Sequence, residues 1–224
     1  GARVITAAGE FTSVTFPFLA HADRGVTVEE RPLADLATWA GPADLVAVSS
    51  VQSADGRLVD LPAVVAAARV VGARVLLDTT QSCGWLPLDC TDVDYVVCGG
   101  YKWLLCPRGT AFLAVRPELL DHLRPLAAGW YAGDDPWTSI YGAPLRLAKD
   151  ARRFDLSPAW FSWVGSAVSL ELLAGLDLEP HAALGAKVLH QWATLGEFDF
   201  VNVVEAPDIA TVAKVSVALG ARGS

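Results

Sequence analysis

Two stretches of the chain place a carboxylate and an amine where a reaction centre is expected. Residues 76–81 and 96–103 each begin as an apolar run typical of a buried strand and end in polar residues. The first run ends at Asp78, and the second is followed by Lys102. In a parallel α/β sheet, ligands bind at the carboxyl ends of the strands. If both runs are strands of one such sheet, Asp78 and Lys102 lie at the same edge.

The lysine has the surroundings that covalent chemistry needs. Lys102 stands between Tyr101 and Trp103, so we expect its stem and its amine to be partly desolvated. Desolvation favours the neutral amine of a lysine, which is the form that Schiff-base chemistry uses. The alternative is a surface lysine whose stem covers apolar residues while its amine stays in water.

The aspartate needs a partner at the end of its strand, because a buried carboxylate must find a cation or hydrogen bonds. A pyridinium nitrogen is one such partner, since an aspartate keeps the ring of pyridoxal phosphate protonated as an electron sink. The alternative is a structural role in which Asp78 caps the next turn. Gln81 can donate its amide to a ring substituent, and Tyr101 can donate its hydroxyl to a phosphate oxygen.

Composition narrows the class of protein. The chain has 224 residues, of which 53% are apolar and 19% charged, so we expect a sizeable core in one large domain or in one domain plus part of another. A net charge of −8 disfavours nucleic acid as a partner, because phosphate binding needs clustered Lys and Arg. The sequence has no apolar run long enough to span a membrane and no secretion signal, so we expect no membrane partner.

The cysteines give no sign of a metal site. No pair of the four cysteines forms a C-x-x-C motif, and no histidine stands at a metal-ligand spacing. We therefore expect free, mostly buried thiols in a reducing, cytoplasmic compartment, and no metal.

Apolar runs alternate with helical patterns over most of the chain. This alternation predicts an α/β fold with a mainly parallel sheet covered by helices on both faces. We expect strands over residues 3–7, 26–28, 45–49, 74–78, 94–98 and 111–115, and helices over residues 14–22, 33–39, 61–71, 117–123 and 158–173. Residues 125–157 break the pattern, and irregular segments of this length are usually functional or bind partners.

The last part of the chain reads as a different unit. Residues 177–180 have the composition of a linker, and a helix over 182–195, a strand over 198–205 and a helix over 207–219 follow. We therefore divide the chain into residues 1–176, a linker over 177–184, and a small α/β piece over 185–224. Because the chain has no methionine and opens within a predicted strand, we expect it to be a piece of a longer protein.

Three motifs together resemble the core of the class V pyridoxal-phosphate enzymes. They are Asp78-Thr79-Thr80-Gln81, then Tyr101-Lys102-Trp103, then Pro107-Arg108-Gly109-Thr110. This family includes kynureninase, the cysteine desulfurases and the class V aminotransferases. The resemblance covers about residues 3–176, and it implies an incomplete, N-terminally truncated large domain of fold type I.

The resemblance implies a role for each polar residue of the two opening stretches. Lys102 would form the internal aldimine with pyridoxal phosphate and shuttle protons. Asp78 would pair with the ring nitrogen, and Gln81 would contact the ring hydroxyl. Tyr101 would bind the phosphate, as the matching tyrosine does in kynureninase-like members.

Four further residues receive roles from the same resemblance. Phe11 falls where the family places the residue that stacks on the ring, and Ser53 falls near an asparagine that contacts the cofactor in many members. Trp130 and Ser157 resemble residues that reach the phosphate of the neighbouring subunit. The resemblance therefore implies a homodimer with a shared site.

The implied activity is the transformation of an amino-acid substrate, either by amino transfer or by kynureninase-like lyase or hydrolase chemistry. Phe11 favours the second, because desulfurases have a histidine at that position, and none of the four cysteines matches the desulfurase nucleophile. The alternative is a non-catalytic fragment or fusion artefact, because the phosphate-cradling loop and the substrate arginine of the family are not recognisable in the sequence.

The tail carries a second resemblance. The residues around Gly196-Glu197-Phe198-Asp199 and Glu205-Ala206-Pro207-Asp208 are similar to part of the GYD domain, a small ferredoxin-like α+β module. A natural fusion, an assembly error in a gene prediction and an engineered chimera are all compatible with this arrangement.

Overall fold

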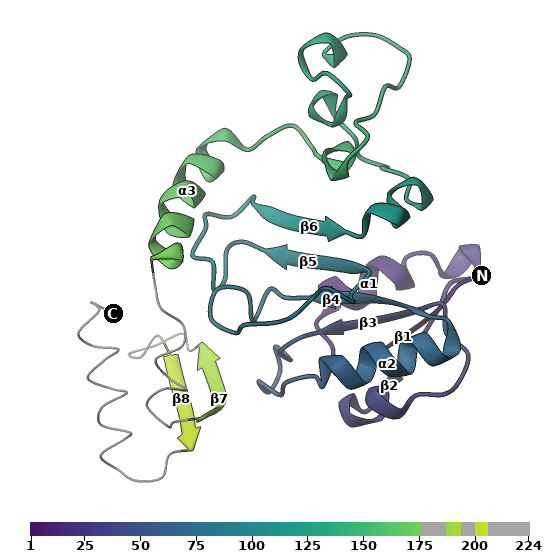
Figure 1. The fold of residues 1–224 in the computed structure, drawn as a ribbon, viewed down its shortest axis with the longest axis vertical. Helices are drawn as coiled ribbons and strands as arrows, with labels where there is room; N and C mark the ends of the chain where they lie inside the picture. Colours follow the sequence, from purple (N-terminus) through teal and green to yellow (C-terminus); the bar gives the residue numbers. More distant parts are fainter. Residues whose placement is uncertain (176–186, 194–199, 206–224) are drawn as a thin grey trace.

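The computed structural model describes residues 1–175, 187–193 and 200–205. Its main body is a six-stranded sheet with the order β2-β1-β3-β4-β5-β6 (Figure 1). The sheet consists of β1 (Arg3–Ala7), β2 (Thr27–Arg31), β3 (Leu45–Ser49), β4 (Arg74–Asp78), β5 (Tyr95–Gly99) and β6 (Ala111–Val115). All neighbouring strands pair parallel except β5 and β6, which pair antiparallel. The predicted, mainly parallel sheet is therefore confirmed.

Helices cover both faces of the sheet, as predicted. Successive residues of a strand point to opposite faces. Ile5, Val46 and Leu77 pack in one core with α2 (Leu61–Val71), whereas Val4 and Ala47 pack with α1 (Thr12–Leu19) on the other face. The third helix, α3 (Trp160–Ala174), packs beside β6 and the loop that follows β5.

Short 3₁₀ turns make up most of the remaining regular structure. They are η1 (Ala22–Arg24), η2 (Leu33–Thr38), η3 (Pro117–His122), η4 (Trp130–Ala132), η5 (Trp137–Ser139) and η6 (Ala151–Phe154). The last three lie in the irregular segment 125–157, which projects from the sheet as a small lobe, drawn at the top of Figure 1.

The ends of several strands and of one helix were predicted correctly from local sequence signals. The bounds of β1, β3, β4, β6 and α2 are those predicted, and β5 is shifted by one residue. In α2, the Asp60 carboxylate accepts the Ala63 N–H at 3.1 Å, and Gly72 ends the helix with a φ of 74°. These two residues supply the cap at each end, so the apolar run between them is fixed in length.

Several predicted helices differ in the structure. Those predicted over 33–39 and 117–123 are the 3₁₀ turns η2 and η3, and α3 begins at Trp160 rather than at residue 158. α1 begins at Thr12 rather than at residue 14, so Pro17 lies inside the helix and not in its first turn. The helix predicted over 182–195 is wrong for its central part, where β7 (Lys187–Ala193) pairs antiparallel with β8 (Phe200–Glu205). Backbone pairing with β8 overrides the helical pattern of that segment. The linker over 177–184 and the helix over 207–219 lie outside the described residues.

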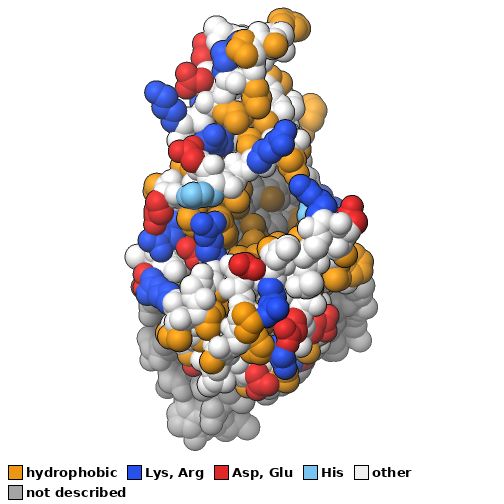
Figure 2. Space-filling view, turned by 90° about the vertical axis from the view of Figure 1, so that its right-hand side faces the viewer, with side chains coloured by type: hydrophobic (Ala, Val, Ile, Leu, Met, Phe, Trp, Pro, Cys, Tyr) orange, Lys and Arg blue, Asp and Glu red, His pale blue; other side chains and the backbone are white. Residues whose placement is uncertain are grey.

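The surface has no strong charge asymmetry on the face drawn in Figure 2. Basic and acidic side chains are interspersed there with apolar ones, and they do not gather into a patch of one sign. Among the residues that the structure describes, no helix is both long enough and apolar enough to cross a membrane.

Candidate functional site

The stretches over residues 76–81 and 96–103 meet at the same edge of the sheet. Asp78 is the last residue of β4 and lies in register with Ser49 of β3 and Val97 of β5. Thr80 ties the two stretches together: its N–H donates to Asp78 Oδ1 at 2.8 Å, and its Oγ1 accepts the Gly99 N–H at 2.8 Å. The predicted juxtaposition of a carboxylate with the loop that carries the lysine is therefore present.

The Asp78 carboxylate is largely buried and has no ion pair within the part of the chain that is described. Burial raises its pKa above the ordinary value, hydrogen bonds from Thr80 lower it, and the negative charge of Glu10 raises it further. A carboxylate in this state gains most from a cation placed beside it.

Gln81 and Ser53, far apart in the sequence, lie together. Gln81 Nε2 donates to Ser53 Oγ at 3.2 Å, and Gln81 Oε1 accepts the indole N–H of Trp103 at 3.1 Å. An indole can only donate, so Trp103 fixes which end of the amide is the oxygen. The amide nitrogen therefore faces the side where Ser53 lies.

Lys102 is exposed, so its expected desolvation is wrong in this structure. The reason is that it lies beyond the end of β5, in a loop at the sheet edge. Its Nζ lies 5.7 Å from the centre of the Tyr101 ring, and Arg108 Cζ lies 4.5 Å from the same ring. The loop turns tightly at Gly100, where a Cβ atom would come within 2.6 Å of Thr110 Oγ1.

Phe11 precedes α1 and is 48% exposed, which leaves its ring available for a contact outside the chain. Its N–H donates to the buried carboxylate of Glu10 at 2.9 Å. Sequence reasoning missed Glu10, although it was detectable: it is a carboxylate three residues after the end of the buried strand β1, much as Asp78 is the carboxylate at the end of β4.

Trp130 and Ser157 are brought together in the projecting lobe, where Trp130 Nε1 donates to Ser157 Oγ at 3.3 Å. The guanidinium of Arg152 fixes this lobe by donating to the carbonyl oxygens of Tyr131, Gly133 and Asp134 at 2.6–2.9 Å. Arg153 forms an ion pair with Asp121 at 2.7 Å.

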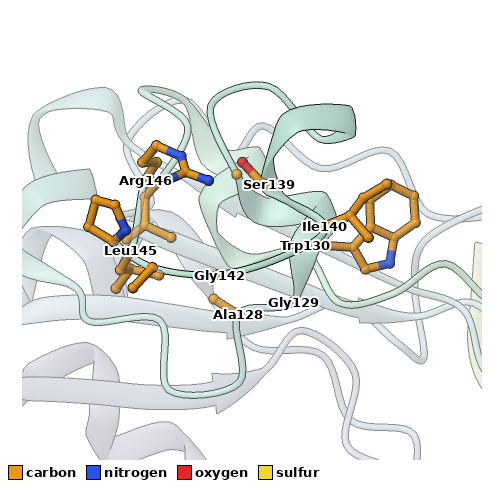
Figure 3. A pocket seen from close by; sticks show the side chains of 12 residues that line it. Ala128, Gly129, Trp130, Ser139, Ile140, Gly142, Leu145 and Arg146 are labelled. Carbon is orange, nitrogen blue, oxygen red and sulfur yellow. The ribbon is translucent and has the colours of Figure 1, made fainter.

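The lobe also holds a hollow of about 490 Å³. Figure 3 shows Trp130 and Ile140 at one end of it, and Leu145 and Arg146 at the other. Its lining includes neither Asp78 nor Lys102, so it is separate from the edge where those residues lie.

All four cysteines are free thiols, as predicted. A hydrogen bond from Cys98 lowers the pKa of Cys83 to about 7. The same interaction and burial raise the pKa of Cys98. Cys83 lies two residues after Gln81, in the loop that follows β4.

Comparison with known proteins identifies the relatives of this chain. The family model described as "Aminotransferase class-V" matches residues 3–221. The chain is 33% identical over 173 residues to "Uncharacterized aminotransferase YcbU" of Bacillus subtilis (strain 168), covering 73% of this chain and 45% of that protein. It is 46% identical over 54 residues to "Glutamine synthetase and cystathionine beta-lyase binding protein" of Thermus thermophilus, covering 24% of this chain and 57% of that protein.

The fold agrees with solved structures. A variant of C-DES with glycine covalently linked to its PLP cofactor superposes with a TM-score of 0.71 at 24% identity, over 85% of this chain and 58% of that one. The chain spans about half the length of the curated relatives that it matches. The match of the family model continues to residue 221, through the segment that we assigned to a separate tail.

Proposed function

This chain belongs to the class-V aminotransferase family, and from that premise we propose that it holds pyridoxal phosphate at the carboxyl edge of its sheet and acts on an amino acid. The observation that carries the proposal is Asp78, a largely buried carboxylate with a raised pKa and no ion pair in the described part of the chain. A protonated ring nitrogen is the cation that such a carboxylate suits.

The residues around Asp78 fit the rest of the cofactor. Gln81 and Ser53 present an amide and a hydroxyl that can bind polar ring substituents, and Phe11 presents an exposed ring that can stack. Tyr101, with Arg108 over its ring, would contact the phosphate. These assignments use only side chains near one edge of the sheet.

When bound, pyridoxal phosphate supplies an electron sink for negative charge at the Cα atom of an amino acid. Lys102 would provide the amine for covalent attachment of the cofactor, and would then move the proton at Cα. Its exposed position leaves the amine accessible to both cofactor and substrate. Asp78 would hold the proton on the ring nitrogen throughout.

The finer features of the proposal concern the reaction and the assembly. We propose amino transfer or a kynureninase-like cleavage, and Phe11 favours the latter. We also propose a homodimer in which Trp130 and Ser157 act on the site of the neighbouring subunit. Their position in a projecting lobe, apart from Asp78, is compatible with a role towards a second copy.

The test is binding and covalent trapping. The 224-residue chain should bind pyridoxal phosphate saturably at micromolar concentrations, and borohydride reduction should leave a phosphopyridoxyl group on Lys102 in a peptide map. Lys102→Ala should abolish the trapped group, while Lys149→Ala, at another exposed lysine, should retain it.

A non-catalytic fragment is the competing interpretation, because the phosphate-cradling loop and the substrate arginine are not recognisable in this sequence. Absence of saturable binding would favour it. Label distributed over all lysines without preference for Lys102 would also contradict the proposed site.

The division of the chain stays a prediction. We propose that residues 185–224 form a GYD-like module behind a linker over 177–184, and the separate pairing of β7 with β8 supports it. Limited proteolysis that cuts first within 177–184 and leaves two resistant pieces would agree with this division. First cuts elsewhere would contradict it.

A further inference from the structure

Glu10 is a buried carboxylate that the proposed chemistry does not use. Only 8% of the residue is exposed. Glu10 Oε1 accepts the Phe11 N–H at 2.9 Å and the Ser49 hydroxyl at 2.6 Å. Glu10 Oε2 accepts the Ser49 N–H at 2.8 Å and the Gln52 side-chain amide at 3.0 Å. Four donors from three residues therefore surround one side chain.

Glu10 accepts a hydrogen bond from each of these four groups. Three of them are N–H groups, which can only donate, and the fourth is the Ser49 hydroxyl. The carboxylate accepts from all four at once. No arginine, lysine or histidine forms an ion pair with Glu10 among the residues described. The chain thus buries a negative charge that only neutral donors stabilise.

The position of Glu10 connects it to the proposed cofactor site in two ways. Through its hydrogen bond it fixes the backbone of Phe11, the residue proposed to stack on the ring. Through Ser49 it lies beside Asp78, because Ser49 and Asp78 are in register on neighbouring strands. The charge of Glu10 also reaches Asp78, whose pKa it raises.

Resting on the proposed function, we infer that Glu10 is a second anionic positioning residue for the cofactor ring. Its carboxylate sets the backbone of Phe11 and adds its negative charge to that of Asp78, so this edge of the sheet favours a cationic ring. A buried charge pays a high desolvation cost, and a cationic ligand between or beside two such carboxylates offsets that cost. The structural observation is that Glu10 accepts hydrogen bonds from Ser49 at the end of β3, and that Ser49 pairs in register with Asp78 at the end of β4.

The experiment compares two ligands that differ only in the ring nitrogen. They are pyridoxal phosphate and its deaza analogue, in which a C–H group replaces that nitrogen. Quenching of tryptophan fluorescence gives both dissociation constants on the full 224-residue chain, without any need for catalysis. The quantity of interest is their ratio, which reports preference for the cationic ring.

We expect wild type to favour pyridoxal phosphate, and Glu10→Gln to reduce that preference by about threefold or more, since an electrostatic contribution is lost. Ser49→Ala removes one hydrogen bond but keeps the charge, so it should retain the wild-type ratio. Circular dichroism and thermal unfolding establish that each variant is folded. A Glu10→Gln chain with an unchanged ratio would overturn the inference, even if both ligands bound more weakly.

Asp78→Asn gives an independent test that does not depend on folding of the Glu10 variant. If Glu10 contributes, some preference for the cationic ring remains after Asp78 is neutralised. Complete loss of preference in Asp78→Asn would assign the whole effect to Asp78 and overturn the inference. If wild type binds neither ligand saturably, the proposed function itself fails, which is a different result from binding without preference.

Discussion

The buried charge of Asp78 lowers the stability of the free chain and favours the binding of a cation. Asp78 keeps a carboxylate in a largely buried position where the only hydrogen bonds described come from Thr80. A buried charge without a cation costs stability in the free chain, and the same charge becomes favourable when a cation binds. The stability of the cofactor-free chain should therefore depend on the charge of Asp78.

We expect Asp78→Asn to stabilise the cofactor-free chain at pH 7. The folded-state pKa of Asp78 is raised above its unfolded value of 3.8, so the folded state holds the proton more tightly. Stability is therefore lost as the pH rises from 3.8 through the raised pKa, and the substitution removes that loss. Melting curves should show a rise of a few degrees, at about 2–4 °C per kcal/mol for a chain of this size.

The gain from Asp78→Asn should shrink as the pH is lowered towards 3.8, because the unfolded aspartate is then protonated as well. Asp55→Asn is the control, since the Asp55 side chain is 42% exposed and already paired with Arg57, and it should give no such gain. A melting temperature for Asp78→Asn equal to or below that of wild type at pH 7 would argue against a costly buried charge.

Cys83 should be the most reactive thiol of the chain near neutral pH. Its pKa of about 7 follows from the hydrogen bond that Cys98 provides to the thiolate, and the thiolate is the reactive form. Alkylation by iodoacetamide, followed by mass spectrometry, should increase through a midpoint near pH 7. Cys98→Ala removes the donor and should move the midpoint up towards the ordinary value of 9.0.

Cys106→Ala serves as the control for that experiment, because Cys106 shares the apolar cluster with Cys98 but is not among the causes of the lowered pKa of Cys83. It should leave the midpoint unchanged. Equal shifts in the two variants would mean that repacking, and not the hydrogen bond, controls Cys83.

At the scale of elements, patterns that are local in sequence were the most predictable. α2 has its cap, its apolar run and its terminal glycine within one short stretch, and β4 carries three apolar residues in succession before it ends in Asp78. β7 is a strand because it pairs with β8, which lies elsewhere in the sequence. The helical pattern over residues 182–195 therefore predicted the wrong element. Periodicity describes one segment at a time and cannot report such a partner.

The candidate site likewise has features that could be predicted from the sequence and features that could not. The approach of Asp78 to the Lys102 loop follows from strand ends in a parallel sheet, and could be predicted. The contact between Gln81 and Ser53 could not, because it depends on how two loops after different strands fold back. The exposure of Lys102 and the hydrogen bonds of Glu10 are likewise tertiary features, set by packing and not by neighbours in sequence.

Arg152 provides a prediction at this scale, because one side chain holds the lobe by three hydrogen bonds to backbone carbonyls. A hydrogen bond from a charged group of this kind contributes about 1.5–3 kcal/mol to stability. Arg152→Ala should therefore raise amide exchange at residues 130–134 by at least about tenfold while α2 keeps its protection. Arg69→Ala, at an exposed ion pair, is the control and should leave the lobe unchanged.

At the scale of the whole molecule, α3 has two different faces. The side that packs on the body of the protein carries leucines of an apolar cluster and two serines that bind the neighbouring loop. Ser162 Oγ donates to the Arg108 carbonyl at 2.9 Å, and Ser169 Oγ donates to the Leu105 carbonyl at 2.8 Å. These contacts hold the loop that follows Lys102. The other face carries Phe161, which is 94% exposed, with further exposed apolar residues along the same side. An exposed apolar stripe of this kind marks an interaction surface.

We expect this stripe to be covered by a second copy of the chain, because the proposed homodimer needs an interface and this stripe is exposed and apolar. Sedimentation equilibrium should show concentration-dependent association that grows stronger with added salt, because salt screens the repulsion between chains of net charge −8. Phe161→Glu places a charge in the stripe and should weaken association at least tenfold. Val70→Glu is the matched control, since Val70 is 82% exposed but lies on α2. A chain that stays monomeric at all concentrations, or equal effects of both substitutions, would remove α3 as the dimer surface.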